Sequence, residues 1–215
     1  KLRHIEIPAA EIENYAIDQA INDRGCRVDI HLASKAKTIF DNYVAVLNAK
    51  IHEKYGITSL KSSKQVNDFI FAMTGKRFDS INKDTIDGII KECDNEDVTR
   101  VLAARKIAYK TSVAKFGAML DCVCRDGTVK GLYRFYGANR TGRWAGRMVQ
   151  MQNLTKSYFD TDEELEAARE DVKNLGLDDL ILMYDNIPSL LSQLLRTAFI
   201  ARKGDKFKDA DFSAI

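Results

Sequence analysis

Apolar residues recur every three or four positions through the first two thirds of the chain, a spacing that predicts helices. Two of these helices are expected over 10–24 and 31–54. Gly25 and Gly56 follow them, at the position where a glycine commonly ends a helix. Between the two helices, residues 26–30 predict a short extended segment.

The third expected helix begins at the capping-box pattern Ser62-Ser63-Lys64-Gln65 and ends at Gly75. Its apolar face is formed by Val66, Phe69, Ile70 and Met73. A shorter helix is expected over 83–93, and one continuous long helix over 96–121.

The pattern changes after residue 121. Asp126-Gly127 predicts a turn, and the aromatic, partly alternating stretch 129–137 predicts a strand. Residues 138–157 are polar and are expected to be irregular. The remaining expected elements are a helix from the capping box at Thr161 to about 174, helices over 177–185 and 188–198, and a strand over 207–215. The expected fold class is α+β, predominantly α-helical, with long helices and an incomplete β-sheet.

Charge changes this picture more than composition does. The 215 residues are 45% hydrophobic and 30% charged, which is ordinary for a globular protein, and the net charge is only +2. However, residues 100–156 hold twelve basic and two acidic side chains, so their formal charge is +10 and the remainder of the chain carries −8. Much of the negative charge lies in 157–182.

Aromatic and amide side chains are interleaved with the cations of this basic stretch, among them Tyr133, Trp144, Gln152 and Asn153. Cations neutralise phosphates, while amides and aromatic rings can contact sugars and base edges. The pattern therefore favours nucleic-acid binding. An ordinary solvated basic face is the alternative that the residues alone leave open.

The four cysteines indicate neither a disulfide framework nor a zinc site. Cys122 and Cys124 are separated by one residue rather than the two to four of usual zinc pairs, and no histidine lies near them in the sequence. No apolar run approaches the roughly 18 residues that a membrane-spanning helix needs. We therefore expect reduced thiols, no membrane partner and a cytoplasmic location.

Four short motifs follow one another in the second half of the chain. They are Thr141-Gly142-Arg143, Gln152-Asn153-Leu154, Arg196-Thr197-Ala198-Phe199-Ile200 and Ala210-Asp211-Phe212-Ser213-Ala214-Ile215. In this order they resemble the family A DNA polymerases of the bacterial DNA polymerase I type, and most nearly the phage and prophage branch. The resemblance covers about residues 11–215 and is strongest at 127–154 and 194–215.

The resemblance implies a division of the chain into three parts. Residues 1–30 would lead into the polymerase region, residues 31–125 would form the helical thumb, and residues 126–215 would form part of the palm. An acidic helical insert at about 157–187 would lie away from DNA, because its charge repels phosphates.

The resemblance also implies a set of DNA-binding residues. Arg143 matches the arginine that the family places in the minor groove at the primer terminus, and Gln152 and Asn153 match residues near the same duplex end. The remaining members of the expected DNA-binding set are Arg140 and the thumb residues Arg105, Lys110, Lys61 and Lys64.

Asp211 matches the first catalytic carboxylate of the family, which would bridge two Mg²⁺ ions, and the carbonyl of Phe212 would add a metal ligand. The complete enzyme would bind primer–template DNA and dNTP. Asp209 is expected to have a structural role. Thr155-Lys156 departs from the family pattern, which has a proline and then a basic residue there, so only the charge is retained.

One aspartate cannot assemble a two-metal site, and the family's fingers and second palm carboxylate are absent from these 215 residues. We therefore expect this chain alone not to polymerise DNA and to depend on a missing downstream portion. Two alternatives remain open: a non-catalytic DNA-binding module derived from a polymerase, and a helical interaction protein with an incidental basic stripe.

Overall fold

The computed structural model describes residues 6–208, which divide into two compact units. We call the first the β unit; it contains 1–34, 115–169 and 193–215. We call the second the helical unit; it contains 35–114 and 170–192. The chain therefore passes between the two units several times, and each is described by itself.

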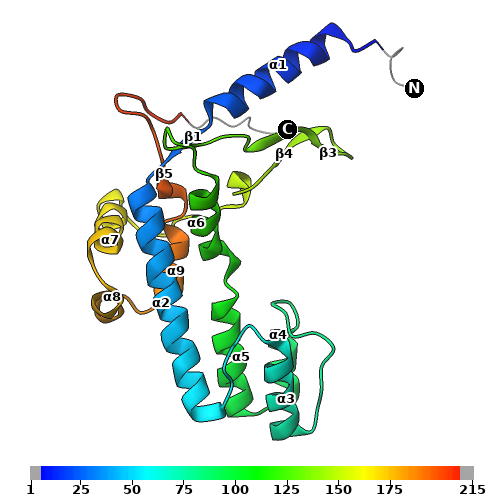
Figure 1. Cartoon of the computed structure of the whole chain (residues 1–215), viewed down its shortest axis with the longest axis vertical. Coiled ribbons are helices and arrows are strands. Elements are labelled where there is room, and N and C mark those ends of the chain that lie inside the picture. The colour runs from blue at the N-terminus through cyan, green and yellow to red at the C-terminus, as the bar shows by residue number, and fades with distance from the viewer. Residues whose placement is uncertain (1–5, 209–215) are drawn as a thin grey trace. The chain divides into compact units, whose positions relative to one another are not determined.

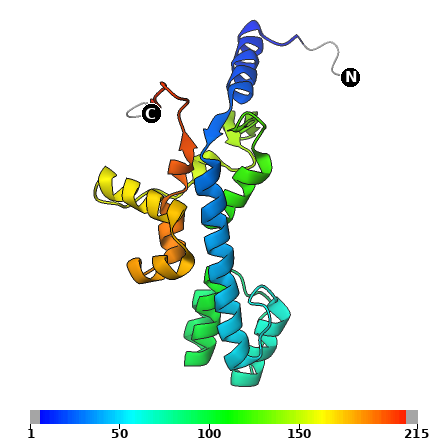
Figure 2. The ribbon, with the colours of Figure 1, turned by 60° about the vertical axis from the view of Figure 1, so that its left-hand side comes forward.

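Helices form the whole framework of the helical unit (Figure 1). Its elements are most of α2 (Ile30–Tyr55), α3 (Ser63–Thr74), α4 (Ile86–Cys93), α5 (Glu96–Ala108), the start of α6 (Thr111–Cys122), the end of α7 (Asp162–Asn174), α8 (Leu177–Met183) and most of α9 (Ile187–Gln193). In both views α8 lies on one side of α2, and α3 with α4 lies on the other (Figures 1 and 2).

An apolar core joins α2, α3, α4 and α5. Its buried members are Ile51, Ile57, Leu60, Val66, Ile70, Ile81, Ile86, Ile89, Val98, Val101, Leu102, Ala104 and Ala108. These positions follow the helical spacing of the sequence, because a residue every three or four positions falls on the same face of a helix.

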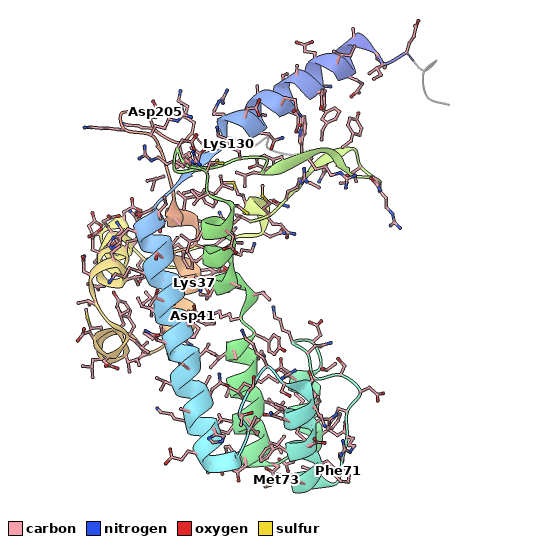
Figure 3. All side chains as sticks on the ribbon, viewed as in Figure 1. Lys37, Asp41, Phe71, Met73, Lys130 and Asp205 are labelled. Atoms are coloured by element: carbon pink, nitrogen blue, oxygen red, sulfur yellow. The ribbon has the colours of Figure 1, made fainter. Side chains whose placement is uncertain are left out.

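The start of α3 forms half of the predicted capping box. Ser62 Oγ accepts a hydrogen bond from the backbone N–H of Gln65 at 3.3 Å, but the Gln65 side chain accepts from the N–H groups of Thr58 and Ser59 instead of reaching back to Ser62. The helix ends at Gly75, which has the left-handed φ of 73°. At that end Phe71 and Met73 point away from the neighbouring helices, so Met73 does not belong to the buried face (Figure 3).

The β unit contains two small antiparallel sheets. In the first, β1 (Cys26–Val28) lies between β2 (Thr128–Val129) and β5 (Phe199–Ile200). The second is a hairpin of β3 (Tyr133–Ala138) and β4 (Arg143–Gly146). The unit also includes α1 (Ala9–Arg24) and the short 3₁₀ helices η1 (Met151–Asn153) and η2 (Arg196–Ala198).

Gly25 makes the junction between α1 and β1 possible. Its φ is +62°, and a Cβ at this position would collide with the carbonyl oxygen of Val129. Only glycine therefore allows the end of α1 to lie against β2.

The predicted fold class is confirmed: the described chain is α+β and predominantly helical, with small antiparallel sheets. Most helix positions are also as expected, but the helix predicted over 96–121 consists of α5 and α6, which are interrupted at Tyr109 and Lys110. At this break the chain makes a contact with a residue that is distant in the sequence: the hydroxyl of Tyr109 donates a 2.8 Å hydrogen bond to the carbonyl of Lys61.

The strand prediction was wrong in four places. The stretch 129–137 is divided between β2 and β3, which belong to different sheets. The stretch 138–157 includes β4 and η1 and is not wholly irregular, and β5 was not predicted. Phe207 and Lys208 are not in a strand, and the rest of the strand predicted over 207–215 lies outside the described residues.

The apolar residues that predicted α1 do not form a buried face. Ile12, Tyr15 and Ile21 are exposed, whereas Asp18 is only 3% exposed. The reason is that α1 contacts the β3–β4 hairpin largely through hydrogen bonds, described below. Within residues 6–208, no helix is both long enough and apolar enough to cross a membrane.

Candidate nucleic-acid interface

The β3–β4 hairpin provides the frame of the candidate interface. Arg134 pairs with Ala145 and Ala138 with Arg143, and the register shifts between these two pairs. Tyr136 lies in this irregular stretch with a φ of +48°. A β-bulge increases the local twist of a hairpin and redirects its side chains.

A short turn closes the hairpin. The backbone N–H groups of Thr141 and Gly142 both donate to the carbonyl of Ala138, at 3.0 and 2.9 Å. Gly142 has a φ of +66°, and a Cβ there would press on the ring of Tyr136. The Thr141-Gly142-Arg143 motif therefore has a structural reason for its glycine, and Arg143 directly follows the turn as the first residue of β4.

Polar contacts with α1 hold the hairpin in place. The indole Nε1 of Trp144 donates to the carboxylate of Asp18 at 2.7 Å. The side chain of Asn22 bridges the backbone of Tyr133: its Oδ1 accepts from the N–H at 2.9 Å, and its Nδ2 donates to the carbonyl at 3.1 Å. These bonds fix both strands relative to α1.

Phe135 is the centre of an aromatic cluster on this hairpin. Its ring makes edge-to-face contacts with Tyr15, Tyr136 and Trp144, at centroid distances of 5.9, 4.8 and 5.6 Å. Aromatic pairs in this geometry contribute about 0.5–1.5 kcal/mol each beyond their buried area. The hairpin is therefore a rigid support for the side chains that it exposes.

Four arginines of the hairpin and its flanks are exposed: Arg134, Arg140, Arg143 and Arg147. None of their guanidinium groups makes a hydrogen bond or an ion pair with any residue in the described range 6–208. The sequence from Gly127 to Phe159 contains no aspartate or glutamate. The result is a concentrated positive surface with unused donors, which suits bidentate contacts to anionic oxygens.

Gln152 and Asn153 lie on η1, directly after the hairpin. A Cβ at Gly146 would collide with the amide group of Gln152, so this side chain lies against the end of β4. The ammonium of Lys115 donates to the carbonyls of Gln150 and Asn153 at 3.3 and 3.1 Å. Burial lowers the pKa of Lys115, because it disfavours the charged form. Lys115 therefore stabilises the position of η1 by hydrogen bonds to its backbone rather than being available for a ligand.

The other predicted DNA-binding residues belong to the helical unit. Lys61 and Lys64 are exposed on either side of the N-cap Ser62, and neither ammonium has a hydrogen bond or ion pair among the described side chains and backbone groups. Lys110, at the break between α5 and α6, is half-buried, and this burial lowers its pKa.

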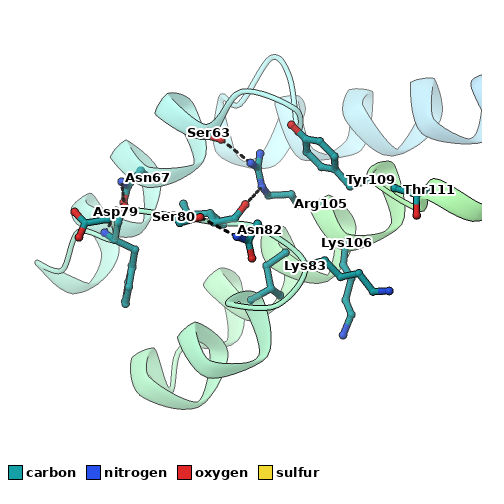
Figure 4. A pocket seen from close by; sticks show the side chains of 13 residues that line it. Ser63, Asn67, Asp79, Ser80, Asn82, Lys83, Arg105, Lys106, Tyr109 and Thr111 are labelled. Atoms are coloured by element: carbon teal, nitrogen blue, oxygen red, sulfur yellow. Dashed lines mark hydrogen bonds between the residues drawn. The ribbon is translucent and has the colours of Figure 1, made fainter. Parts of the chain in front are cut away.

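Arg105 does not have the expected position. Its side chain is 2% exposed, and its guanidinium donates to the carbonyl of Ile81 at 3.1 Å, to the carbonyl of Leu60 and to Ser63 Oγ at 2.7 Å (Figure 4). It also lies over the ring of Tyr109, 4.8 Å from the centroid. The prediction that Arg105 faces the DNA backbone was wrong, because its donors are directed to two loops of its own unit.

A cavity of about 340 Å³ adjoins Arg105 and is drawn in Figure 4. Ser63, Asn82, Lys83 and Lys106 contribute to its lining. Lys106 is not free to bind an anion there, because its ammonium pairs with both oxygens of Asp87 at 2.8 and 2.9 Å.

Several other cations of the basic stretch are also paired. Arg100 contacts Glu96 at 2.6 Å, and Lys130 contacts Asp126 at 3.2 Å. Hydrogen bonds from the hydroxyl and the backbone N–H of Thr128, and then from Lys130, lower the pKa of Asp126 to about 2. The twelve basic residues between 100 and 156 therefore do not form one uniform surface.

The structure thus places Arg140, Arg143, Gln152 and Asn153 in the β unit, and Lys61, Lys64 and Lys110 in the helical unit. Sequence reasoning missed the contribution of Asp18, since a lone aspartate among apolar helix positions gives no signal of its partner Trp144. Asp211 and Phe212 lie outside the described residues. Over 6–208, no group of three histidine, cysteine, aspartate or glutamate side chains is arranged to hold a metal ion.

Comparison with known proteins adds one finding. No protein-family model matches the chain, and no solved structure matches it. A protein of Bacillus phage SP02 named DNA polymerase is 41% identical over 206 residues, which is 96% of this chain and 31% of that protein. The chain therefore spans about a third of the length of the curated relative it matches, and over nearly all its own length it is similar to part of a phage DNA polymerase.

Proposed function

We propose that this chain is the part of a family A DNA polymerase that binds the primer–template duplex, and that the β3–β4 hairpin contacts the duplex near the primer terminus. The main support for this proposal is the set of exposed arginines, unpaired within residues 6–208, on a hairpin without acidic residues. The 41% identity to a phage DNA polymerase gives independent support.

Physical chemistry favours DNA as the ligand of the hairpin. Binding of cations to phosphates releases condensed counterions, which gives favourable and strongly salt-dependent affinity. In the minor groove, the acceptors of A·T and T·A pairs are the same, so a contact there senses pair geometry with little dependence on sequence. A polymerase needs this kind of contact, because it must accept every correct pair.

We assign the contact roles as follows. Arg143 lies in the minor groove at the primer terminus, and Arg140 together with Gln152 and Asn153 contacts the same duplex end. Lys61, Lys64 and Lys110 contact backbone phosphates from the helical unit, which corresponds to the thumb. Arg105 is a positioning residue, because its donors hold the loops at Leu60 and Ile81.

We further propose that Asp211, with the carbonyl of Phe212, provides ligands for Mg²⁺ when the complete polymerase binds dNTP. The metal would supply activation of the primer hydroxyl and charge neutralisation on the triphosphate. One carboxylate and one carbonyl do not by themselves fit the two-ion site, and the described residues add no cluster of metal ligands. The proposed binding of DNA by the hairpin and the helical unit does not require the metal.

Replacement of Arg143 by alanine tests the proposal. We expect Arg143→Ala to weaken binding to a primer–template junction by about tenfold or more, because a hydrogen bond that involves a charged group contributes about 1.5–3 kcal/mol. Binding to blunt duplex should weaken less. Fluorescence anisotropy with labelled DNA across a range of salt concentrations measures both affinities.

Lys91→Ala is the matched control, since Lys91 is an exposed cation on α4 outside the basic stretch and the net charge changes equally. Equal losses for junction and blunt duplex would contradict the role of Arg143. Affinity that does not fall with salt would contradict DNA binding through the hairpin altogether.

A further inference from the structure

A second cationic surface lies in the β unit, outside the basic stretch 100–156. It surrounds a cavity of about 390 Å³ between the end of α1, β1 and the segment that follows β5. The basic residues of its lining are Arg24, Arg27, Arg202, Lys206 and Lys208. Asp205, labelled in Figure 3, is the one acidic residue among the described residues of this lining.

The five cations have no partners within the described part of the chain. Each of these residues is exposed, and no guanidinium or ammonium among them makes a hydrogen bond or ion pair there. Five like charges around one cavity repel one another, and the single carboxylate among the described lining residues does not compensate them. A bound polyanion would remove this repulsion.

The remainder of the cavity lining is apolar or aromatic. Ile21, Leu132 and Ile200 contribute aliphatic surface, and Tyr133 and Phe207 contribute rings. Phe207 is 62% exposed, so most of its ring is free to stack on a ligand. Aromatic rings beside a cationic groove are the combination by which proteins bind single-stranded nucleic acid.

The backbone around the cavity is preorganised. The double hydrogen bond from Asn22 fixes Tyr133, and the pairing of Arg27 with Ile200 fixes the adjacent strands. The N–H of Asp205 donates to the carbonyl of Arg202 at 2.9 Å, which closes a turn with Lys203 at its tip. The turn returns Lys206 to the cavity, whereas Lys203 is not part of the lining.

Two other uses of the cavity fit less well. One carboxylate without a histidine does not make a metal site. Cys26 is in the lining, but burial raises the pKa of its thiol and so disfavours the reactive thiolate. Neither a bound metal nor a cysteine nucleophile is therefore supported.

We propose that this cavity binds a nucleoside phosphate unit of single-stranded DNA, with the cations around the phosphates and the base against Phe207. The volume lies within the roughly 300–1,000 Å³ range of ligand pockets. The inference rests on the proposed function only for the choice of DNA as the source of the nucleotide. It adds a site for unpaired strand to the duplex contact assigned to the hairpin.

The test uses the 215-residue chain and a labelled oligodeoxythymidylate, which cannot form a duplex with itself. We expect Arg202→Ala/Lys206→Ala to weaken binding of this oligonucleotide by more than about tenfold and to reduce the salt slope by about 0.7 for each lost phosphate contact. Phe207→Ala should cost about tenfold, because it removes the stacking surface. Blunt duplex should bind these variants nearly as well as it binds the parent chain.

Two matched controls keep the result specific. Lys203→Ala removes a cation of the same turn that does not line the cavity, and Tyr158→Ala removes an exposed ring, 74% accessible, elsewhere in the β unit. Equal losses for Lys203→Ala and the cavity variants would overturn the proposal, as would a parent chain that does not bind the oligonucleotide.

Thymidine monophosphate as a competitor distinguishes the source of the ligand. Competition that the cavity variants abolish would support a nucleotide site that takes free nucleotides. Oligonucleotide binding without such competition would support a site for strand. Because Arg143→Ala is measured on primer–template DNA, failure of the hairpin assignment and failure of the cavity assignment give different results.

Discussion

The β3–β4 hairpin and helix α5 are both rich in basic residues, yet their cations have opposite surroundings. On the hairpin, Arg134, Arg140 and Arg143 are exposed and have no partners in the described chain. On α5, Arg100 pairs with Glu96 and Lys106 pairs with Asp87. The charge of a segment therefore predicts a binding surface only after its internal partners have been found.

Among the cations of α5, Arg105 differs most from the exposed arginines of the hairpin, because it is buried and hydrogen-bonded. Its replacement should have the largest effect of the variants considered, and that effect is on the free energy of unfolding. Arg105→Ala leaves two carbonyls and Ser63 without their donor and opens space in a buried site. We expect a loss of about 3 kcal/mol in the free energy of unfolding, measured by urea denaturation followed by circular dichroism.

Arg100→Ala is the control on the same helix and should cost far less, because its ion pairs are exposed to solvent. A weaker DNA affinity of Arg105→Ala with an unchanged unfolding midpoint would break the comparison, since it would show that the buried guanidinium acts on DNA.

A pair of double variants measures the contrast between the two surfaces directly. Arg140→Ala/Arg143→Ala should reduce the salt slope of duplex binding, by about 0.9 for each phosphate contact that is lost. Arg100→Ala/Lys106→Ala removes the same charge from α5 and should leave the slope nearly unchanged. Similar slopes for the two double variants would show that only total charge matters.

The smallest expected effect concerns Asp126, the partner of Lys130. Its pKa is lowered to about 2 in the folded chain, below the value of about 3.9 for an unfolded aspartate. Ionised Asp126 therefore stabilises the folded chain above about pH 4, and this contribution is lost as the pH falls toward 2. Urea midpoints measured between these pH values should fall less steeply for Asp126→Asn than for the parent chain. Identical slopes would show that the Thr128 hydrogen bonds do not favour the carboxylate.

Local pattern predicted much of the fold, because most helices carry their own apolar spacing and end signals. Gly25, Gly75 and Ser62 act within a few residues of the positions that they cap. The break at Tyr109 had no such signal, since the residue contacts the distant Lys61. Strand β4 was missed because Arg143-Trp144-Ala145-Gly146 is only four residues long, lies within a mostly polar stretch and becomes a strand only by pairing with β3.

For the candidate site too, features that depend on nearby residues could be predicted, and features that depend on distant contacts could not. Arg140 and Arg143 could be found from charge and motif, because exposure is the common condition of an arginine. The burial of Arg105 could not, since its three acceptors come from segments 24 to 45 residues away along the chain. The cavity cations were also missed, because Arg202 is distant in the sequence from Arg24 and Arg27 and only the β1–β5 pairing brings them together.

The buried guanidinium has a consequence for how the helical unit responds to acid. Most protein ion pairs fail at low pH because the carboxylate takes up a proton. The acceptors of Arg105 are two carbonyls and a hydroxyl, and none of them titrates in the acid range. The hydrogen bonds of Arg105, which connect α5 to the loops at Leu60 and Ile81, therefore persist at a pH low enough to protonate the carboxylates of the surface ion pairs.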